Sequence, residues 1–235
     1  MPELQDHSTL IREFFSQSLM KEQVAFLYLG YSGIILRIKD GAIAVDPSNL
    51  LGDRALPAFS RLDLLLFTHS HYDHYNRALA NKLLENTNAH IVAPKQVAED
   101  LKDRISLDRM TVASHGLKLD INGFRVTPFE GVHPRPITIY KIEKDAYSIF
   151  HAGDSGYSPI EGSSVKLAFL PTGRPSPSCS PENALKFVRD LKPIIAVAMH
   201  GTQLQMIKFR KLVEKDTVET SVIIPKEYKI ETVVP

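Results

Sequence analysis

Phe67-Thr68-His69-Ser70-His71-Tyr72-Asp73-His74 follows an apolar run, residues 62–67, in which one aspartate is the only polar residue. Such a run is typical of a buried strand that continues directly into a loop. His69 and His71 are two positions apart, so in an extended loop both imidazoles project to the same side. A solvated polar loop is the alternative, but no core needs three histidines and an aspartate at the end of a strand. Because imidazole nitrogens and carboxylate oxygens are common ligands of transition metals, the stretch predicts a metal site.

The composition is that of an ordinary globular protein, with 43% hydrophobic and 23% charged residues in a chain of 235. An α/β chain of this length does not need to divide, so we expect a single domain over residues 1–235. The net charge of +1 provides no global field for nucleic acid, which argues against a processive nuclease. If the substrate is a small anion, a local cluster of basic residues would have to bind it.

The single cysteine excludes an internal disulfide framework, and no apolar stretch approaches the roughly 18 residues that span a bilayer. A continuous signal-peptide core is not expected either, because charged residues interrupt the first 22 positions. They include Glu3, Asp6, Arg12 and Glu13. We therefore expect a cytoplasmic protein that does not act at a membrane.

Residues 1–22 are predicted to form an N-terminal helical extension. Their apolar side chains recur at helical spacing, and Asp6 or Ser8 could cap the helix. These apolar residues are Leu10, Ile11, Phe14, Phe15 and Leu19. The helix is expected to pack on the core of its own domain. Docking to a second subunit, which would make a homo-oligomer, is the alternative.

Short apolar or β-branched runs between turn signals predict strands in both halves of the chain. The expected strands are residues 24–29, 34–38, 42–45, 62–67, 90–93, 111–113, 116–120, 124–127, 137–142, 146–150, 165–170, 194–198, 221–224 and 228–232. Further helices are expected at residues 75–85, 96–101, 181–191 and 204–213. Strands flanked by helices in both halves predict an α/β fold, the αββα four-layer sandwich.

Local turn and cap signals separate these elements. Asp40-Gly41 and Asn122-Gly123 are typical of hairpin turns, and residues 143–145 form a third expected turn. Ser180 and Pro181 are placed as the cap and the first residue of a helix.

Three later residues of the metal-ligand type have the same placement, directly after an apolar strand. They are His133, Asp154 and His200. Any one of them alone would more often be structural, but with the first stretch they give five histidines and two aspartates on strand-end loops. That set is enough for two metal ions that share one carboxylate. Asp46 also ends a strand, where it could be a turn former or could support a metal ligand through a hydrogen bond.

The histidine stretch resembles the HxHxDH motif of the metallo-β-lactamase superfamily, and the three later residues follow in the order of that family. The similarity extends from Leu29 to Glu231. Within the superfamily, the chain is most similar to the branch of small metal-dependent hydrolases that includes ascorbate 6-phosphate lactonase. The segments that carry this closer likeness are Gly30-Tyr31-Ser32-Gly33, Ala152-Gly153-Asp154-Ser155-Gly156 and Phe169-Leu170-Pro171-Thr172-Gly173.

The resemblance implies the metallo-β-lactamase fold and a binuclear metal site with seven ligands. One metal would be held by His69, His71 and His133, the other by Asp73, His74 and His200, and Asp154 would bridge them. Asp46 would brace a ligand, and His151 would make a structural or supporting hydrogen bond. The two divalent transition metals are expected to be zinc, with manganese or iron(II) as alternatives. His71 stands where oxygen-reducing di-iron members carry glutamate, so the resemblance favours hydrolysis.

We therefore expect a metal-dependent hydrolase in which a metal-bound hydroxide attacks an ester, lactone or phosphoester bond of a small substrate. Asp73 in its protonated form, or a nearby water, would help the leaving group to depart. Arg135 and Arg174 are on loops expected near the metals, where they could bind an anionic group or be solvated. Cys179 has no recognisable base beside it and is expected to be a bystander. The alternatives are a nuclease or phosphodiesterase, and a non-enzymatic metal-binding sensor.

Overall fold

The structure is a computed structural model that describes residues 6–160, 162–216 and 219–235. Two compact units divide the chain: unit 1 is Met1–Ala113 with Glu227–Val234, and unit 2 is Ser114–Lys226 with Pro235. The expectation of one domain over residues 1–235 stays a prediction. Residues 1–5 of the expected N-terminal extension lie outside the described residues.

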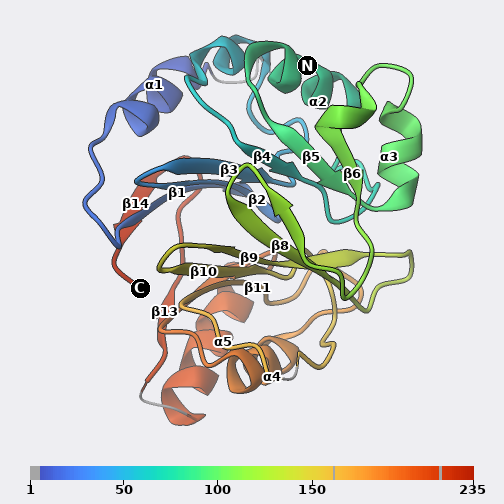
Figure 1. Cartoon of the computed structure of the whole chain (residues 1–235). Helices are drawn as coiled ribbons and strands as arrows, with labels where there is room; N and C mark the ends of the chain where they lie inside the picture. The colour runs from blue at the N-terminus through green and yellow to red at the C-terminus, as the bar shows by residue number, and fades with distance from the viewer. Residues whose placement is uncertain (1–5, 161, 217–218) are drawn as a thin grey trace. The chain divides into compact units, whose positions relative to one another are not determined.

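Unit 1 contains a mixed sheet that, in the described residues, has seven strands in the order β14-β1-β2-β3-β4-β5-β6 (Figure 1). Its strands are β1 (Val24–Gly30), β2 (Gly33–Ile38), β3 (Gly41–Val45), β4 (Leu64–Leu66), β5 (His90–Ala93), β6 (Met110–Val112) and β14 (Ile230–Val233). Pairing is antiparallel from β14 to β3 and parallel from β3 to β6. Ile38 pairs with Gly41, which confirms the predicted hairpin between β2 and β3. All side chains of β3 and β4 are buried, and this explains why their sequences are continuously apolar.

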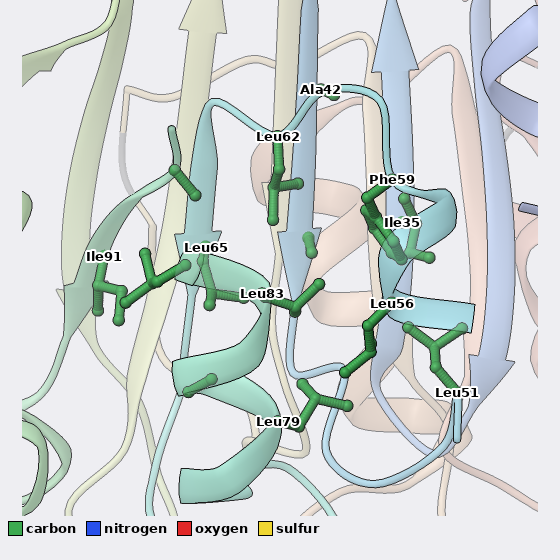
Figure 2. Packing of buried hydrophobic residues seen from close by; sticks show 14 of the residues in the cluster. Ile35, Ala42, Leu51, Leu56, Phe59, Leu62, Leu65, Leu79, Leu83 and Ile91 are labelled. Carbon is green, nitrogen blue, oxygen red and sulfur yellow. The ribbon is translucent and has the colours of Figure 1, made fainter. Parts of the chain in front are cut away.

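Helices pack on one face of the unit 1 sheet (Figure 1). The helices of this unit are α1 (Ser8–Ser16), α2 (Arg77–Asn86), α3 (Lys95–Leu101) and the 3-10 helices η1 (Asp53–Ala58) and η2 (Leu107–Arg109). Figure 2 shows Leu65 of β4 and Leu83 of α2 within the same packed cluster. Leu56 of η1 and Ile91 of β5 belong to it as well. Segments far apart in the sequence therefore share one apolar core, which holds the end of β4 in place.

The first helix packs on this core, as predicted, and within residues 6–22 it covers Ser8–Ser16. Ile11 and Phe14 of α1 are fully buried in the unit 1 cluster. The N–H of Ser8 donates to Asp6 Oδ1 at 2.9 Å at the start of the helix. The guanidinium of Arg37 donates to the carbonyl oxygen of Phe14 near its end.

Unit 2 contains a second mixed sheet, again with seven strands among the residues described, in the order β13-β12-β11-β10-β9-β8-β7. Its strands are β7 (Leu119–Ile121), β8 (Phe124–Glu130), β9 (Thr138–Lys144), β10 (Tyr147–His151), β11 (Leu167–Pro171), β12 (Ile195–Met199) and β13 (Ser221–Ile223). Pairing is antiparallel from β7 to β10 and parallel from β10 to β13. Ile121 pairs with Phe124, which confirms the hairpin predicted at Asn122-Gly123.

Two helices, α4 (Pro181–Leu191) and α5 (Gln203–Asp216), pack on the unit 2 sheet (Figure 1). Phe187 and Phe209 are their largest fully buried side chains. Ser180 Oγ accepts the N–H of Asn183 at 3.2 Å, so the predicted cap of α4 is confirmed. None of the helices in the described part of the chain is long and apolar enough to cross a membrane.

Parallel strands bring their carboxyl ends to one edge of a sheet. In unit 1, Val45 of β3 pairs with Leu66 of β4, so Asp46 and Thr68 follow these strands side by side. The N–H of Asp46 extends the pairing by donating to Leu66 O at 3.0 Å. In unit 2, the loops after β10, β11 and β12 leave the sheet at one edge for the same reason. Each sheet thus gathers several of the predicted site loops.

Two predicted helix boundaries are wrong: α5 continues to Asp216, three residues beyond its predicted end, and α2 starts two residues later than predicted because of a local cap. The sequence pattern predicts a helix from Tyr75, whereas α2 begins at Arg77. Asn76 has an extended backbone, and its side chain accepts the N–H of Leu79 at 2.9 Å. Asn76 is therefore the N-cap, and it stops the helix from starting earlier.

The turn predicted at residues 143–145 is also misplaced. β9 continues through Lys144, which pairs with Tyr147 of β10, so that Asp145 and Ala146 form the turn. Asp145 adopts a left-handed backbone with φ of 50°, as two-residue hairpins require. The other predicted strands overlap the observed ones and differ from them only at their ends.

Leu83→Ala should lower the free energy of unfolding by about 2–5 kcal/mol, because it leaves a cavity at a fully buried position of the unit 1 core. Leu107→Ala removes the same atoms from a side chain that is 78% exposed. It should change the free energy by less than about 0.5 kcal/mol. Urea unfolding followed by circular dichroism measures both values. Equal effects would contradict the assignment of Leu83 to the core.

Candidate metal centre

The loop after β4 gathers its histidines by a tight turn. The N–H groups of His74 and Tyr75 both donate to His71 O, at 3.0 and 2.8 Å. The turn brings His74 back towards His69, so that their ring centroids are 4.1 Å apart. The rings of His69 and His71 are 4.5 Å apart. Unit 1 therefore brings three of the predicted ligands together at the end of one strand.

Nitrogen and oxygen atoms in this loop lie at the spacing of metal ligands. His69 Nε2 is 2.9 Å from His71 Nδ1, and Asp73 Oδ2 is 3.6 Å from His74 Nε2. A tetrahedral ion that binds its ligands at about 2.1 Å would space them about 3.4 Å apart. His69 and His74 are buried, whereas His71 and Asp73 are half-buried. Neighbouring donors in unit 1 can therefore face a common cation.

The carboxylate of Asp46 accepts hydrogen bonds from the histidine loop and holds it in place. Its Oδ1 accepts the N–H of Thr68 at 2.7 Å, and its Oδ2 accepts the Thr68 hydroxyl at 2.6 Å. The same Oδ2 lies 2.7 Å from His74 Nδ1. Asp46 is fully buried, so these donors compensate its charge in place of bulk water.

These contacts fix which nitrogen of each imidazole carries the proton in the neutral ring. A carboxylate oxygen only accepts, so His74 carries its proton on Nδ1. Thr68 donates its hydroxyl proton to Asp46, and its oxygen, 3.0 Å from His69 Nδ1, then accepts from that ring. Both rings thereby present Nε2 as the coordinating atom, and a carboxylate behind a histidine is the usual support of a metal ligand.

Unit 2 carries three of the predicted ligands, and two of them, His133 and His200, lie close to the third, Asp154. Its Oδ2 is 3.2 Å from His133 Nε2 and 3.9 Å from His200 Nε2. His133 follows β8, Asp154 follows β10 and His200 follows β12. The side chain of Asp154 is only 4% exposed. The carboxylate of Asp154 therefore lies close to both imidazoles.

Backbone contacts tie the loops of these ligands to each other. The N–H of Gly156 donates to Val132 O at 2.7 Å, and the N–H of Val132 donates to Ser155 Oγ at 2.8 Å. A Cβ at Gly131 would lie 2.6 Å from Ser155 Oγ, so only glycine allows this approach. The loop that carries His133 is therefore held directly against the loop that carries Asp154.

Left-handed backbone conformations occur at two of the strand ends. Asp46 has a φ of 47° and His200 a φ of 43°. Such values are uncommon for residues other than glycine, and they cluster at functional sites. Beside His200, a Cβ at Gly201 would lie 2.1 Å from Thr172 Oγ1, so the chain passes Thr172 at a distance that only glycine permits.

His151 lies at the end of β10 and is buried. Its Nδ1 accepts the N–H of Gly153 at 3.2 Å, and its ring centroid is 6.1 Å from that of Phe169. These contacts give the ring a hydrogen bond within the loop that leads to Asp154.

Arg135 and Arg174 are both exposed. The N–H of Arg135 lies 3.3 Å from His133 Nδ1. The residue before Arg174 donates its N–H to His200 O at 3.0 Å. Both guanidinium groups therefore extend into solvent from loops that are bonded to predicted ligands.

All seven predicted ligands belong to groups of histidine and aspartate that could hold a metal ion. Imidazole nitrogen and carboxylate oxygen suit zinc, manganese and iron(II). Two further residues with roles at the site were missed in the sequence. Thr68 stands directly before the first histidine, but its partner Asp46 comes from another strand. Gln205 accepts a hydrogen bond from the backbone of Arg174. Its only sequence signal is the Thr-x-x-Gln pattern of a capping box, in which it is the last residue.

Comparison with known proteins identifies the family. A profile described as beta-lactamase superfamily domain matches residues 42–201. A UPF0173 metal-dependent hydrolase of Thermoplasma acidophilum is 30% identical over 185 residues, which are 70% of this chain and 78% of that protein. One of Thermococcus onnurineus is 28% identical, over 85% of this chain and 96% of its own. Igni18, a metallo hydrolase of Ignicoccus hospitalis, has a TM-score of 0.74 at 25% identity, covering 90% of this chain and 98% of its own.

The predicted fold class is confirmed by these likenesses, and the closer resemblance to the lactonase branch stays a prediction. Both the family profile and the Thermoplasma relative cover well over half of the chain. The chain therefore belongs to the metallo-β-lactamase superfamily, within the UPF0173 family of metal-dependent hydrolases.

Proposed function

We propose that this chain is a binuclear metal-dependent hydrolase that cleaves an ester, lactone or phosphoester bond in a small anionic substrate. The observation that carries the proposal is the buried Asp46 carboxylate, 2.7 Å from His74 Nδ1 and 2.6 Å from the Thr68 hydroxyl. A metal-ligating histidine commonly donates its second ring N–H to such a carboxylate. The names of the relatives from Thermoplasma and Thermococcus support the same class of reaction.

The seven predicted ligands are proposed to divide between two divalent cations as the family resemblance implies. The first cation takes His69, His71 and His133, the second takes Asp73, His74 and His200, and Asp154 serves both. Distances within each unit support this division. They are 2.9 Å between His69 Nε2 and His71 Nδ1, and 3.2 Å between His133 Nε2 and Asp154 Oδ2.

Zinc, or manganese or iron(II) in its place, would supply a Lewis acid and an activated water at neutral pH. The chain's own residues have three further roles in this proposal. Asp46 and Thr68 keep the imidazoles in their ligating tautomers. Asp73, whose carboxyl group is half-buried, gives a proton to the leaving group. Arg135 and Arg174 bind the anionic group of the substrate, because the guanidinium fork matches a carboxylate or phosphate.

A thiol nucleophile has no place in this proposal. The pKa of Cys179 is raised to about 11, mainly by burial and in smaller part by the negative charge of Asp154. Its Sγ donates to Gly173 O at 3.2 Å. At neutral pH the group is a protonated thiol, whereas the thiolate is the reactive form. We therefore assign the attack to water, with Cys179 as a bystander.

Protein purified without any chelator should contain about two transition-metal ions per chain. His69→Ala should lower the metal content and slow hydrolysis of a panel of esters, lactones and phosphodiesters. Loss of a supporting residue costs 10- to 100-fold, so loss of a ligand should cost at least about 100-fold. His90→Ala, at a histidine that contacts Thr111 in the β5–β6 region, is the control. Elemental analysis and initial rates measure the two effects. Metal-free wild type together with unchanged hydrolysis in His69→Ala would sink the proposal.

Asp46→Asn should weaken metal binding by about 10- to 100-fold while the fold is kept, because the amide keeps the shape of the side chain and loses its charge. Competition with a chelator of known affinity measures the change. Asp63→Asn is the matched control: its carboxylate accepts the N–H of Ala42 at 2.8 Å, at the opposite ends of β3 and β4. If both variants bind metal equally well, Asp46 does not support the ligands.

Cys179 should react slowly with Ellman's reagent in the folded protein. With a pKa of about 11, only about a thousandth of the thiol is ionised at pH 8. Labelling should therefore be about 100-fold slower than that of a free thiol, and it should accelerate as the pH rises towards 11. Unfolding in guanidinium should restore the rate of a free thiol. Rapid labelling of the native protein at pH 8 would show that Cys179 is activated.

A further inference from the structure

A short turn, residues 173–176, carries Arg174 at the carboxyl edge of the unit 2 sheet. The N–H of Ser176 donates to Gly173 O at 3.1 Å and closes the turn. The N–H of Gly173 donates to His200 O at 3.0 Å, and Ser176 Oγ donates to Asp154 O at 2.6 Å. The backbone around Arg174 is therefore fastened to the loops of two predicted metal ligands.

The third attachment is the side chain of Gln205, in the first turn of α5. Gln205 Oε1 accepts the backbone N–H of Arg174 at 3.0 Å. The same oxygen accepts the N–H of Thr202 at 3.0 Å and its hydroxyl at 3.1 Å. One amide oxygen thus joins the start of α5 to the turn that carries Arg174.

Part of this arrangement is a capping box, which needs no substrate to explain it. The N–H of Gln205 donates to Thr202 Oγ1 at 3.3 Å, while the Gln205 side chain accepts from the N–H of Thr202. The bond to Arg174 is not part of a capping box. It is this additional bond that separates a positioning role for Gln205 from a role in starting the helix.

The turn also fits closely over the amide. A Cβ at Gly173 would lie 2.2 Å from the side chain of Gln205. Any residue larger than glycine would therefore push the turn and the amide apart. Glycine at this position allows the backbone N–H of Arg174 to reach Gln205 Oε1.

The guanidinium of Arg174 is exposed, and no carboxylate in the residues that the structure describes forms an ion pair with it. Other arginines are paired: Arg61, Arg125 and Arg189 each contact an aspartate. An arginine whose backbone is held at several points loses less conformational freedom when its side chain binds a ligand. The planar fork of Arg174 is thus available for a carboxylate or phosphate.

We propose that Arg174 binds a carboxylate or phosphate group of the substrate, and that Gln205 is the positioning residue that holds Arg174 for this contact. The inference rests on the proposed hydrolase function and adds Gln205 as the residue that positions one of its anion-binding arginines. The molecule that is cleaved carries an anionic group in addition to the ester, lactone or phosphoester bond that reacts.

Inorganic phosphate, titrated calorimetrically into the purified full chain, is the probe. Arg174→Ala should weaken phosphate binding about tenfold or more, because it removes a charge-assisted contact. Gln205→Met keeps the side-chain length, removes the amide oxygen and should weaken binding by about three- to tenfold. Since Gln205 acts through Arg174, Gln205→Met should have no further effect in the Arg174→Ala background.

Two variants separate positioning from helix capping. Gln203→Met makes the same change two positions earlier, at an exposed residue of α5. Thr202→Ala removes the cap hydroxyl and leaves the bond between Gln205 and Arg174. Both should keep phosphate affinity within about twofold, although Thr202→Ala should lower Tm. The proposal is wrong if Gln205→Met weakens binding no more than Thr202→Ala does. Additive losses in the double variant, or no phosphate binding by the wild type, would also overturn it.

Two 4-nitrophenyl esters, the neutral acetate and the anionic hemisuccinate, connect binding with hydrolysis. Gln205→Met should raise KM for the hemisuccinate by about three- to tenfold, while kcat and the reaction of the acetate stay within about twofold. If the wild type holds no metal and cleaves neither ester but binds phosphate through Arg174, the proposed function fails and the anion site stands. If the wild type is an active metalloenzyme and all variants bind phosphate alike, only the anion site fails.

Discussion

Asp46 places a buried carboxylate between two strand ends, and the histidine loop is ordered around it. A carboxylate without water is costly unless it receives hydrogen bonds. Among the residues that the structure describes, the donors come from the segment after β4, through Thr68 and His74. The loop therefore reaches its stable form only when it satisfies the charge. Because β3 and β4 are paired in register, the sheet itself sets the separation of donor and acceptor.

Unit 2 orders its site residues by a different means. Asp154 faces two imidazoles, and main-chain hydrogen bonds fix the loops that carry them. Gly131 and Gly201 allow these loops to come together at distances that no other residue permits. The loops of unit 2 are thus positioned by glycines that lack side chains, whereas the histidine loop of unit 1 is positioned by one buried charge. The side chains of Ser176 and Gln205 add hydrogen bonds that hold the turn with Arg174 to these loops.

Local patterns were enough to predict much of this. The histidine stretch after an apolar run predicted the loop with the metal ligands and the superfamily. Ser180 and Pro181 predicted the start of α4, because a helix cap involves residues within one turn of each other. Contacts between residues far apart in the chain could not be predicted from the sequence. The pattern around Asp46 fitted either a turn former or a residue that supports a metal ligand, and only the pairing of β3 with β4 places Thr68 beside it. The sequence does not predict the substrate for a related reason: the same metal ligands serve many reactions, and the residues that select a substrate come together only through long-range contacts.

The left-handed backbones of Asp46 and His200 carry a consequence for attempts to stabilise the protein. Such a conformation costs a residue with a Cβ roughly 1–2 kcal/mol, and glycine adopts it without that cost. At Asp46, glycine would lose the hydrogen bonds from Thr68 and His74, and this cost offsets the gain. At His200, selection for heat resistance alone would favour glycine, which would delete the imidazole. Libraries designed for robustness should therefore vary the helix-covered cores and leave the edges of the two sheets unchanged.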